Sequence, residues 1–219
     1  MSQETLQKLR LLVPGILLFI LIPPLFLKTL DVPSFLKTFA SLQVLSDSAA
    51  AIVLGSLYII LDIRRFAWRK PVNLINDNIK DFLLIACDQD PAVSAAAARL
   101  REGRTLMNVF YRFIDRDASL QEKAKRVRFN GLLWSSVADL ITIAALGILA
   151  YLVAFAVSQR TYQLALAGVL TLVLVIGRFL LMPAVTQRHM QLSNDQLEFM
   201  RQNYRTEVCG EIARLASEF

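Results

Sequence analysis

The sequence predicts an all-α integral membrane protein with four transmembrane helices and a cytoplasmic layer of further helices. Of its 219 residues, 55% are hydrophobic and 19% are charged, and the mean hydropathy is +0.48. A soluble domain carries about 25% charged residues. The apolar residues also form four blocks near the length of about 20 residues that a helix needs to cross a bilayer. Composition and block length together argue against a soluble enzyme.

The third and fourth blocks predict a transmembrane hairpin. Residues 132–157 and 162–185 are predominantly apolar, and only the four polar residues 158–161 separate them. The second block, 42–63, reaches full length only by including Asp47, and we still expect it to cross the membrane. Its small residues Ala51 and Gly55 permit close approach of another helix.

The first block, residues 11–27, contains prolines that should kink or break its helix near both ends, at Pro14 and at Pro23–Pro24. A cleaved signal peptide is the competing interpretation, because Lys8 and Arg10 precede the apolar run. No small-x-small cleavage site follows the run, so we expect a retained anchor.

The four blocks divide the chain into residues 1–63 with two spans, a helical insert at 64–131, the hairpin at 132–185 and a C-terminal helix at 186–219. The insert carries fourteen basic residues, whereas the two loops on the opposite side hold only Lys28, Lys37 and Arg160. Basic residues concentrate on the cytoplasmic side of bacterial membranes. We therefore expect a multi-pass inner-membrane protein with both termini in the cytoplasm.

The insert has helical periodicity. Pro71 suits the first turn of one helix, and Asp90 suits the cap of a second helix that tolerates Gly103 and ends at residues 115–117. Ser119 and Glu122 form a capping box for a third helix, which continues into the span that begins at residue 132.

The C-terminal segment carries an apolar stripe whose positions advance by three or four residues. The stripe is expected to pack either on the helix that begins at Pro71 or on another subunit. Its members are Leu197, Met200, Tyr204, Val208, Ile212, Leu215 and Phe219.

No pattern of catalytic or metal-binding residues stands out. His189 lacks a second ligand at metal-binding spacing, and nucleotide-binding and hydrolase motifs are absent from the sequence. Cys87 and Cys209 both fall on the predicted cytoplasmic side and are expected to be reduced thiols. We therefore expect no enzyme activity, no metal and no cofactor.

The predicted hairpin spans contain two charged residues, and a charge inside a span normally faces a partner or water. Asp139 and Arg178 lie at equal depth on the two helices of the hairpin, about 10 Å from its inner end. They are expected to pair, either as a salt bridge that fixes helix register or as part of a hydrated vestibule lined with Ser135, Ser136 and Thr142. Asp62 is expected to pair with its neighbours Arg64 and Arg65.

Two clusters of basic residues in the insert are candidate contacts for an anionic ligand such as a nucleotide or oligonucleotide. The alternative is that both are solvated or lipid-facing basic surfaces. The clusters are Arg99, Arg101 and Arg104, and Lys123, Lys125, Arg126 and Arg128.

The layout resembles the small membrane proteins of bacterial antiphage systems. The features that carry the resemblance are a short basic start, the VPGILLF run with Pro14 and Gly15, four spans, a basic helical insert of about 65 residues and a helical tail. The resemblance extends to nucleotide-gated effectors of the Hailong and CBASS systems and to the membrane subunit of Kiwa. It implies a homotetramer with a cytoplasmic receptor surface.

Two functions follow as expectations. In the first, an oligomer, expected to be a tetramer, receives an anionic nucleotide or oligonucleotide on its basic helices and permeabilises the inner membrane. In the second, a non-conducting sensor or scaffold recruits a soluble cytoplasmic partner protein. Both interpretations place membrane lipid around the spans.

Overall fold

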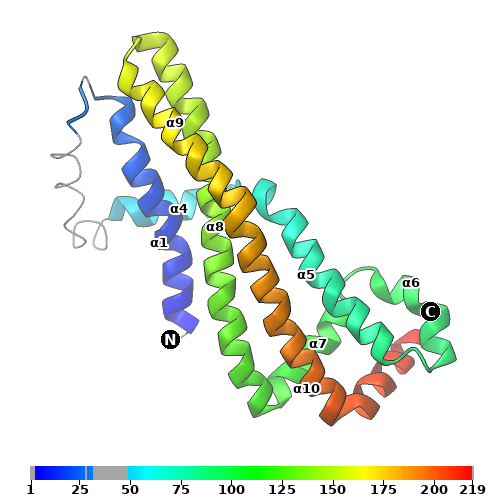
Figure 1. Cartoon of the computed structure of the whole chain (residues 1–219). Helices are drawn as coiled ribbons and strands as arrows, with labels where there is room; N and C mark the ends of the chain where they lie inside the picture. The colour runs from blue at the N-terminus through cyan, green and yellow to red at the C-terminus, as the bar shows by residue number, and fades with distance from the viewer. Residues whose placement is uncertain (1–2, 28, 32–48, 219) are drawn as a thin grey trace. The chain divides into compact units, whose positions relative to one another are not determined.

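The computed structural model describes residues 3–27, 29–31 and 49–218 (Figure 1). Within these ranges the chain forms helices and no strand, which confirms the all-α class. The chain divides into two compact units. We call Met1–Arg69 with Leu132–Ala184 the membrane unit, and Lys70–Gly131 with Val185–Phe219 the helical unit.

Three helical stretches in the described residues are long and apolar enough to cross a membrane, which is one fewer than expected. They are Thr5–Leu25, Ala118–Ser158 and Thr161–Ala216. The first consists of α1 (Gln3–Leu21) and a 3-10 turn (Pro23–Leu25), and the second is α8. The third consists of α9 (Thr161–Ile176), a π-helical segment (Gly177–Leu181) and α10 (Met182–Ala216), and α10 is kinked at Tyr204, whose φ of −132° is not helical.

The described part of the second predicted span, α4, is too short to cross a membrane. Helix α4 (Ala49–Ile60) has 12 residues, or about 18 Å at 1.5 Å per residue, against a hydrocarbon core of roughly 30 Å. Residues 42–48 of that predicted span lie outside the described residues, as do Lys28, Lys37 and Phe219. The described part is therefore a short apolar helix packed within the membrane unit.

Helices α1 and α4 cross at two glycines (Figure 1). A Cβ atom on Gly15 would lie 1.8 Å from the Ala51 carbonyl oxygen, and one on Gly55 would lie 2.0 Å from the Leu11 carbonyl oxygen. Ala51 itself is fully buried. The two backbones therefore touch, as the small residues of the second block predicted.

The prediction was a kink or a break at Pro14; Pro14 lies inside α1, which continues through it, so the helix is not broken at this end of the block. The prediction for the other end is confirmed, because α1 ends at Leu21 and Pro23 begins the 3-10 turn.

The helical hairpin formed by α8 and α9 supplies donors to the carbonyl oxygens left free where α1 ends. The Tyr151 hydroxyl donates to the Leu21 oxygen at 2.7 Å, and the Tyr162 hydroxyl donates to the Leu27 oxygen at 2.5 Å. The Arg160 guanidinium donates to the same Leu27 oxygen. These bonds hold the end of α1 against the hairpin.

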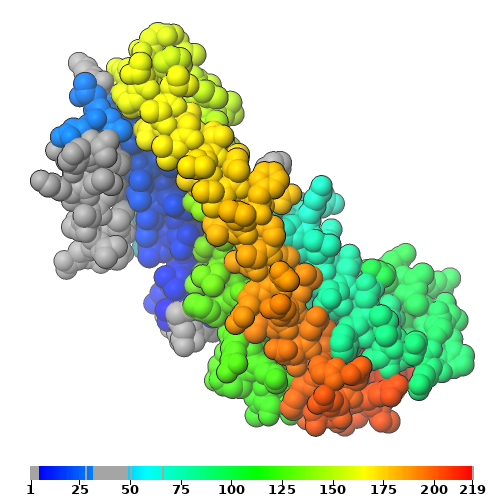
Figure 2. All heavy atoms as spheres, in the orientation of Figure 1, coloured from blue at the N-terminus to red at the C-terminus, as the bar shows by residue number. Residues whose placement is uncertain are grey.

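Large apolar side chains remain exposed along the hairpin, including Leu149, Val157, Leu172 and Phe179. In Figure 2 the hairpin side chains (yellow-green and yellow) form a continuous surface. An extended apolar surface of this kind is expected where lipid is the solvent.

The insert between α4 and α8 contains three helices, whereas two were predicted there before α8. Helix α5 covers Arg65–Ala86 and contains Pro71 in its interior rather than in its first turn. The second predicted helix is two, α6 (Pro91–Arg101) and α7 (Thr105–Arg116), because Gly103 adopts a positive φ of 64° between them.

The predicted cap of α6 is confirmed, since the Ala92 amide donates to Asp90 Oδ1 at 2.9 Å. Helix α8 begins one residue earlier than the predicted capping box, and its cap is Asp117, whose side chain accepts from the Leu120 amide. The Tyr204 hydroxyl bond to Asp117, together with the Leu120 amide, lowers the pKa of that carboxyl below its usual range. The prediction that α8 is one long helix entering the third span is confirmed.

The apolar stripe of α10 packs on helices of its own chain, as the first of the two alternatives predicted. Leu197, Met200, Val208 and Ile212 are buried. Side-chain contacts join α10 to three helices: Asn78 of α5 to Asn194, Arg112 of α7 to Glu211, and Asp117 at the start of α8 to Tyr204.

Cys87 and Cys209 form a disulfide with their Cα atoms 5.3 Å apart, so the expectation of reduced thiols is wrong in this structure. Cys87 directly follows α5, and Cys209 lies on α10. The expectation rested on the predicted compartment, and the sequence does not show that the fold brings these two positions, 122 residues apart, within bonding distance.

Adding a methyl group at the helix crossing should destabilise the membrane unit. We expect Gly15→Ala and Gly55→Ala each to lower the free energy of unfolding by about 2 kcal/mol, because the helices must separate to admit the new Cβ. Gly168→Ala is the matched control, since its Cβ would have no neighbour within 4 Å. Thermal unfolding in detergent measures the effect, and equal melting temperatures for Gly15→Ala and Gly168→Ala would contradict the crossing.

The disulfide should stabilise the helical unit, because it closes a long loop in the unfolded chain. Replacing both cysteines with alanine is expected to lower the free energy of unfolding by about 3 kcal/mol. A reductant should lower the melting temperature of the wild type and leave that of the double variant unchanged. Rapid alkylation of both thiols in unreduced, folded protein would show that the bond is absent.

Candidate functional site

A buried ion pair lies in the membrane unit. Arg64 Nη1 is 3.8 Å from Asp139 Oδ1. Asp139 is 1% exposed on α8, and the Arg64 side chain is 15% exposed. Arg64 follows the turn after α4, in which Asp62 adopts a positive φ of 46°, a conformation that aspartate tolerates better than most residues. The turn thus places a charge from the end of α4 beside the middle of a long apolar helix.

Aromatic and hydroxyl side chains surround this pair. The Tyr58 hydroxyl, on α4, lies near both Asp139 and Thr142. The Arg64 guanidinium carbon is 5.1 Å from the centroid of the Trp68 ring, at which distance a cation–π attraction is expected. Trp68 in turn lies 5.7 Å from Trp134 between ring centroids. We call Tyr58, Arg64, Asp139 and Thr142 the buried polar cluster.

The buried polar cluster is incompletely hydrogen-bonded. Four of its buried atoms make no hydrogen bond of good geometry to another described residue: the Tyr58 hydroxyl, Arg64 Nε, Arg64 Nη1 and Asp139 Oδ1. A buried polar group without a partner costs about 1–3 kcal/mol, and more when it is charged. Each such group in a native structure calls for an explanation, such as a bound water molecule or a change of conformation.

The predicted partner of Asp139 is wrong. Arg178 is exposed in the membrane unit and lies in the π-helical segment Gly177–Leu181. A π-helical turn holds more residues than an α-helical turn, so the face of each residue can no longer be read from 3.6-residue periodicity. Matching residues by their depth on two regular helices also leaves out residues in turns, and the turn after α4 brings Arg64 to Asp139. Asp62, the expected partner of Arg64, is exposed.

The other predicted intramembrane polar residues lie on α8. Ser135 and Thr142 are buried and donate to the Leu132 and Ala138 carbonyl oxygens of their own helix. Ser136 is half-buried. The spacing of Ser135, Asp139 and Thr142 by four and three residues places them on one face of α8.

Some of the predicted anion-binding residues form ion pairs within the chain. In the first cluster, Arg101 forms a 2.5 Å ion pair with Asp81, and the side chains of Arg99 and Arg104 are solvent-exposed. In the second, Lys125 pairs with Glu122 at 2.5 Å, and the Lys123 ammonium lies 5.8 Å from the Phe199 ring. Arg126 and Arg128 are exposed.

His189 belongs to the helical unit, where the Asn130 side chain lies 3.3 Å from its Nδ1. Burial lowers the pKa of the His189 imidazole, which favours the uncharged form of the ring. Among the described residues there is no group of three or more histidine, cysteine, aspartate or glutamate side chains placed to hold a metal ion.

Sequence reasoning missed Tyr58 and Arg64 as members of the site. The sequence offers Asp62 as a nearby acid for Arg64, and that local pairing gives no reason to bring Arg64 to Asp139. One feature of the sequence does point to Arg64. Asp139 lies inside an apolar helix and requires a cation or a hydrogen-bond donor, and Arg64 comes shortly after another apolar helix.

The sequence matches no protein family model, and neither a curated protein nor a solved structure is significantly similar to it.

If Arg64 is the partner of Asp139, removing either charge should destabilise the membrane unit. We expect Arg64→Gln and Asp139→Asn each to lower the free energy of unfolding by about 3 kcal/mol, because each leaves a buried charge unpaired. The double variant Arg64→Met with Asp139→Leu should recover much of that loss.

Arg178→Gln is the control, since Arg178 is exposed and removing its charge should leave the melting temperature unchanged. Melting in detergent compares the four proteins. A loss of stability in Arg178→Gln equal to that in Asp139→Asn would restore the original pairing.

Proposed function

We propose that this chain is the subunit of an oligomeric membrane effector that opens a path for ions when its helical unit receives an anionic signal. The observation that supports this proposal is the buried polar cluster. A charge pair used only to fix helix register would be expected to have its hydrogen bonds completed. Here the Tyr58 hydroxyl and atoms of both charged groups lack such bonds, although they lie among apolar helices.

The cluster provides a two-state element. In the closed state, Asp139 and Arg64 attract one another and the surrounding helices exclude water. In the open state, the two charges separate and water hydrates them, which recovers solvation energy that the closed state lacks. A ligand shifts such an equilibrium only by its difference in affinity between the two states.

Oligomerisation is part of this proposal. Three long helices and the short α4 are too few to enclose a water-filled pathway within one subunit. The exposed apolar side chains of α8 and α9 offer surfaces for lipid or for neighbouring subunits. Closed rotational symmetry is the usual arrangement for identical subunits, and we propose a tetramer.

The resemblance of the layout to antiphage membrane proteins suggests where the protein acts and what it binds. We propose that it lies in a bacterial inner membrane with both termini in the cytoplasm, and that its signal is a nucleotide or oligonucleotide. The concentration of basic residues in the insert supports this orientation. Helix α8 contributes residues to both units, so a rearrangement at one end of this helix has a covalent route to the other.

Weakening the closed state should make the protein leak without any ligand. We expect Asp139→Asn in liposomes to raise ion flux roughly tenfold, which corresponds to a loss of about 1.4 kcal/mol from the closed state. Tyr58→Phe removes a buried hydroxyl without changing charge and should raise flux less. A fluorescent ion-efflux assay on purified protein makes the measurement, after chromatography has verified that each variant assembles.

Thr171→Val is the matched control, because Thr171 lies on α9 and its hydroxyl bonds only to the Ala167 carbonyl oxygen one turn earlier. Its flux should equal that of the wild type. Correctly assembled Asp139→Asn and Tyr58→Phe proteins that remain as tight as the wild type would contradict a conducting role. That result would favour the non-conducting scaffold that recruits a soluble partner.

A further inference from the structure

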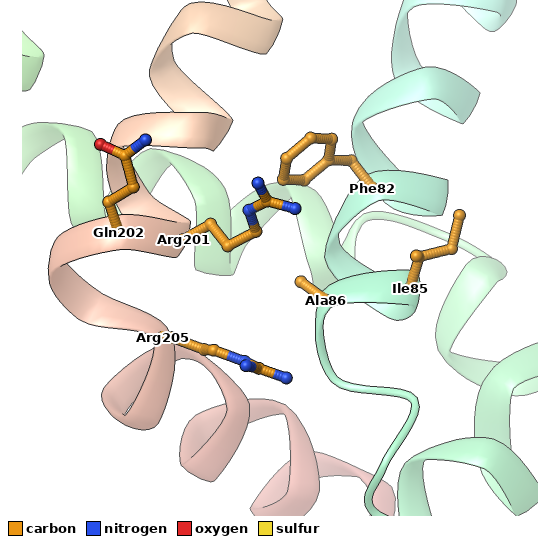
Figure 3. A pocket seen from close by; sticks show the side chains of 6 residues that line it. All are labelled: Phe82, Ile85, Ala86, Arg201, Gln202 and Arg205. Atoms are coloured by element: carbon orange, nitrogen blue, oxygen red, sulfur yellow. The ribbon is translucent and has the colours of Figure 1, made fainter.

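A groove of about 370 Å³ lies within the helical unit, between α5 and α10 (Figure 3). Helix α5 contributes an apolar wall, and α10 contributes a wall of arginine and glutamine side chains. The lining residues are Phe82, Ile85, Ala86, Arg201, Gln202 and Arg205. Ligand sites for small molecules usually measure about 300–1,000 Å³, so this groove accommodates a molecule of modest size.

The two arginines lie on either side of a kink in α10 at Tyr204 (φ −132°), and both extend toward α5 (Figure 3). The Arg201 guanidinium lies 6.0 Å from the centroid of the Phe82 ring and forms a 2.9 Å ion pair with Glu198. Gln202 donates to the same carboxylate at 2.8 Å. Glu198 therefore neutralises part of the charge at Arg201.

Arg205 makes no ion pair or hydrogen bond with the residues that the structure describes. Its guanidinium points to the α5 side of the groove, below Ala86 (Figure 3). Planar guanidinium groups bind phosphate through two parallel N–H donors, and this geometry favours arginine over lysine for such anions. The uncompensated positive charge of the groove thus lies at Arg205.

The apolar wall determines what accompanies the anion. Phe82 presents an aromatic ring next to Arg201, and Ile85 and Ala86 extend the apolar surface toward Arg205. Aromatic side chains stack on flat ligand groups, and aliphatic surface binds hydrocarbon. The groove suits a phosphate attached to an aromatic or apolar moiety better than a bare anion.

The disulfide fixes the spacing of the two walls. Cys87 directly follows Ala86, and Cys209 lies one turn after Arg205. A narrow crevice continues from the groove to Cys209 and to the buried Met200 and Val208. Because apolar residues of α5 and α10 line this crevice together, packing between the two helices holds the walls of the groove in place before a ligand binds, which lowers the ordering cost of binding.

We propose that this groove binds a phosphate ester, with Arg205 as the principal phosphate contact, Arg201 as a secondary contact and Phe82 as the surface for the attached aromatic or apolar group. The phosphate chemistry is shared by free nucleotides and by anionic phospholipid headgroups. This site would be the receptor site that the proposed function requires. Ligand binding to the groove does not depend on that function, and only the effect of binding on ion flux rests on it.

Binding to purified full-length protein tests the site with three probes: ATP, inorganic phosphate, and nanodiscs that contain phosphatidylglycerol in place of phosphatidylcholine. We expect ATP or phosphatidylglycerol to bind and inorganic phosphate to bind more weakly, because it lacks a group for Phe82. Calorimetry in detergent measures the soluble probes. Native mass spectrometry of protein released from the nanodiscs counts retained lipid.

Arg205→Gln should weaken binding roughly tenfold through the loss of a charge-assisted contact. Arg201→Gln should weaken binding less, because the ion pair with Glu198 already neutralises part of the Arg201 charge. Phe82→Leu retains apolar volume and should weaken the esters by several-fold while leaving inorganic phosphate unchanged. Arg188→Gln on the same helix α10 is the control for overall charge and should not change binding.

Dependence of ATP binding on Arg205 would identify a soluble nucleotide, and the same dependence of lipid retention would identify a headgroup; either supports the groove. The groove would be ruled out if folded Arg205→Gln and Phe82→Leu proteins bound every probe as the wild type does. It would also be ruled out if none of the three probes bound to the wild type. Binding is measured without flux, and the leak of Asp139→Asn is measured without ligand. The groove and the proposed function therefore fail independently.

Discussion

The packing of the membrane unit depends on how a carboxylate is accommodated among apolar helices. Asp139 is 1% exposed, and Arg64, at 3.8 Å, is its ionic partner. A charge in such surroundings must be paired, hydrated or neutralised. The sharp turn at Asp62 precedes Arg64, Trp68 packs on the Arg64 guanidinium, and Trp134 packs on Trp68. The unit encloses a polar centre that its apolar exterior would not suggest.

The close contact between α1 and α4 makes this polar centre possible. The two helices touch through Gly15 and Gly55, so α4 lies near enough to α8 for Tyr58 to reach Asp139. The end of α1 is held separately, by hydrogen bonds from Tyr151 and Tyr162 to carbonyl oxygens that the proline turn leaves free. Backbone contact and carbonyl satisfaction thus fix the elements that carry Tyr58 and Arg64.

The helical unit follows ordinary globular physics. An apolar stripe on α10 is buried against α5, α7 and the start of α8, and a disulfide joins α5 to α10. Burying that stripe brings two arginines of α10 opposite an apolar face of α5. The resulting groove contains a cation, Arg205, whose charge no described acid neutralises. Its walls come from segments separated by more than a hundred residues, so no local pattern in the sequence reveals it.

The sequence by itself determined the all-α class, three long apolar helices, the cap at Asp90 and the continuity of α8, because composition, periodicity and capping are local properties. It did not determine which charged groups meet. Arg178 was matched to Asp139 by depth on two regular helices, whereas the π-helical segment and the turn after α4 made Arg64 the partner. The length of α4, the break at Gly103 and the bond between Cys87 and Cys209 likewise depended on tertiary structure. Each is decided by distances between segments remote in sequence or by a backbone conformation that composition leaves open.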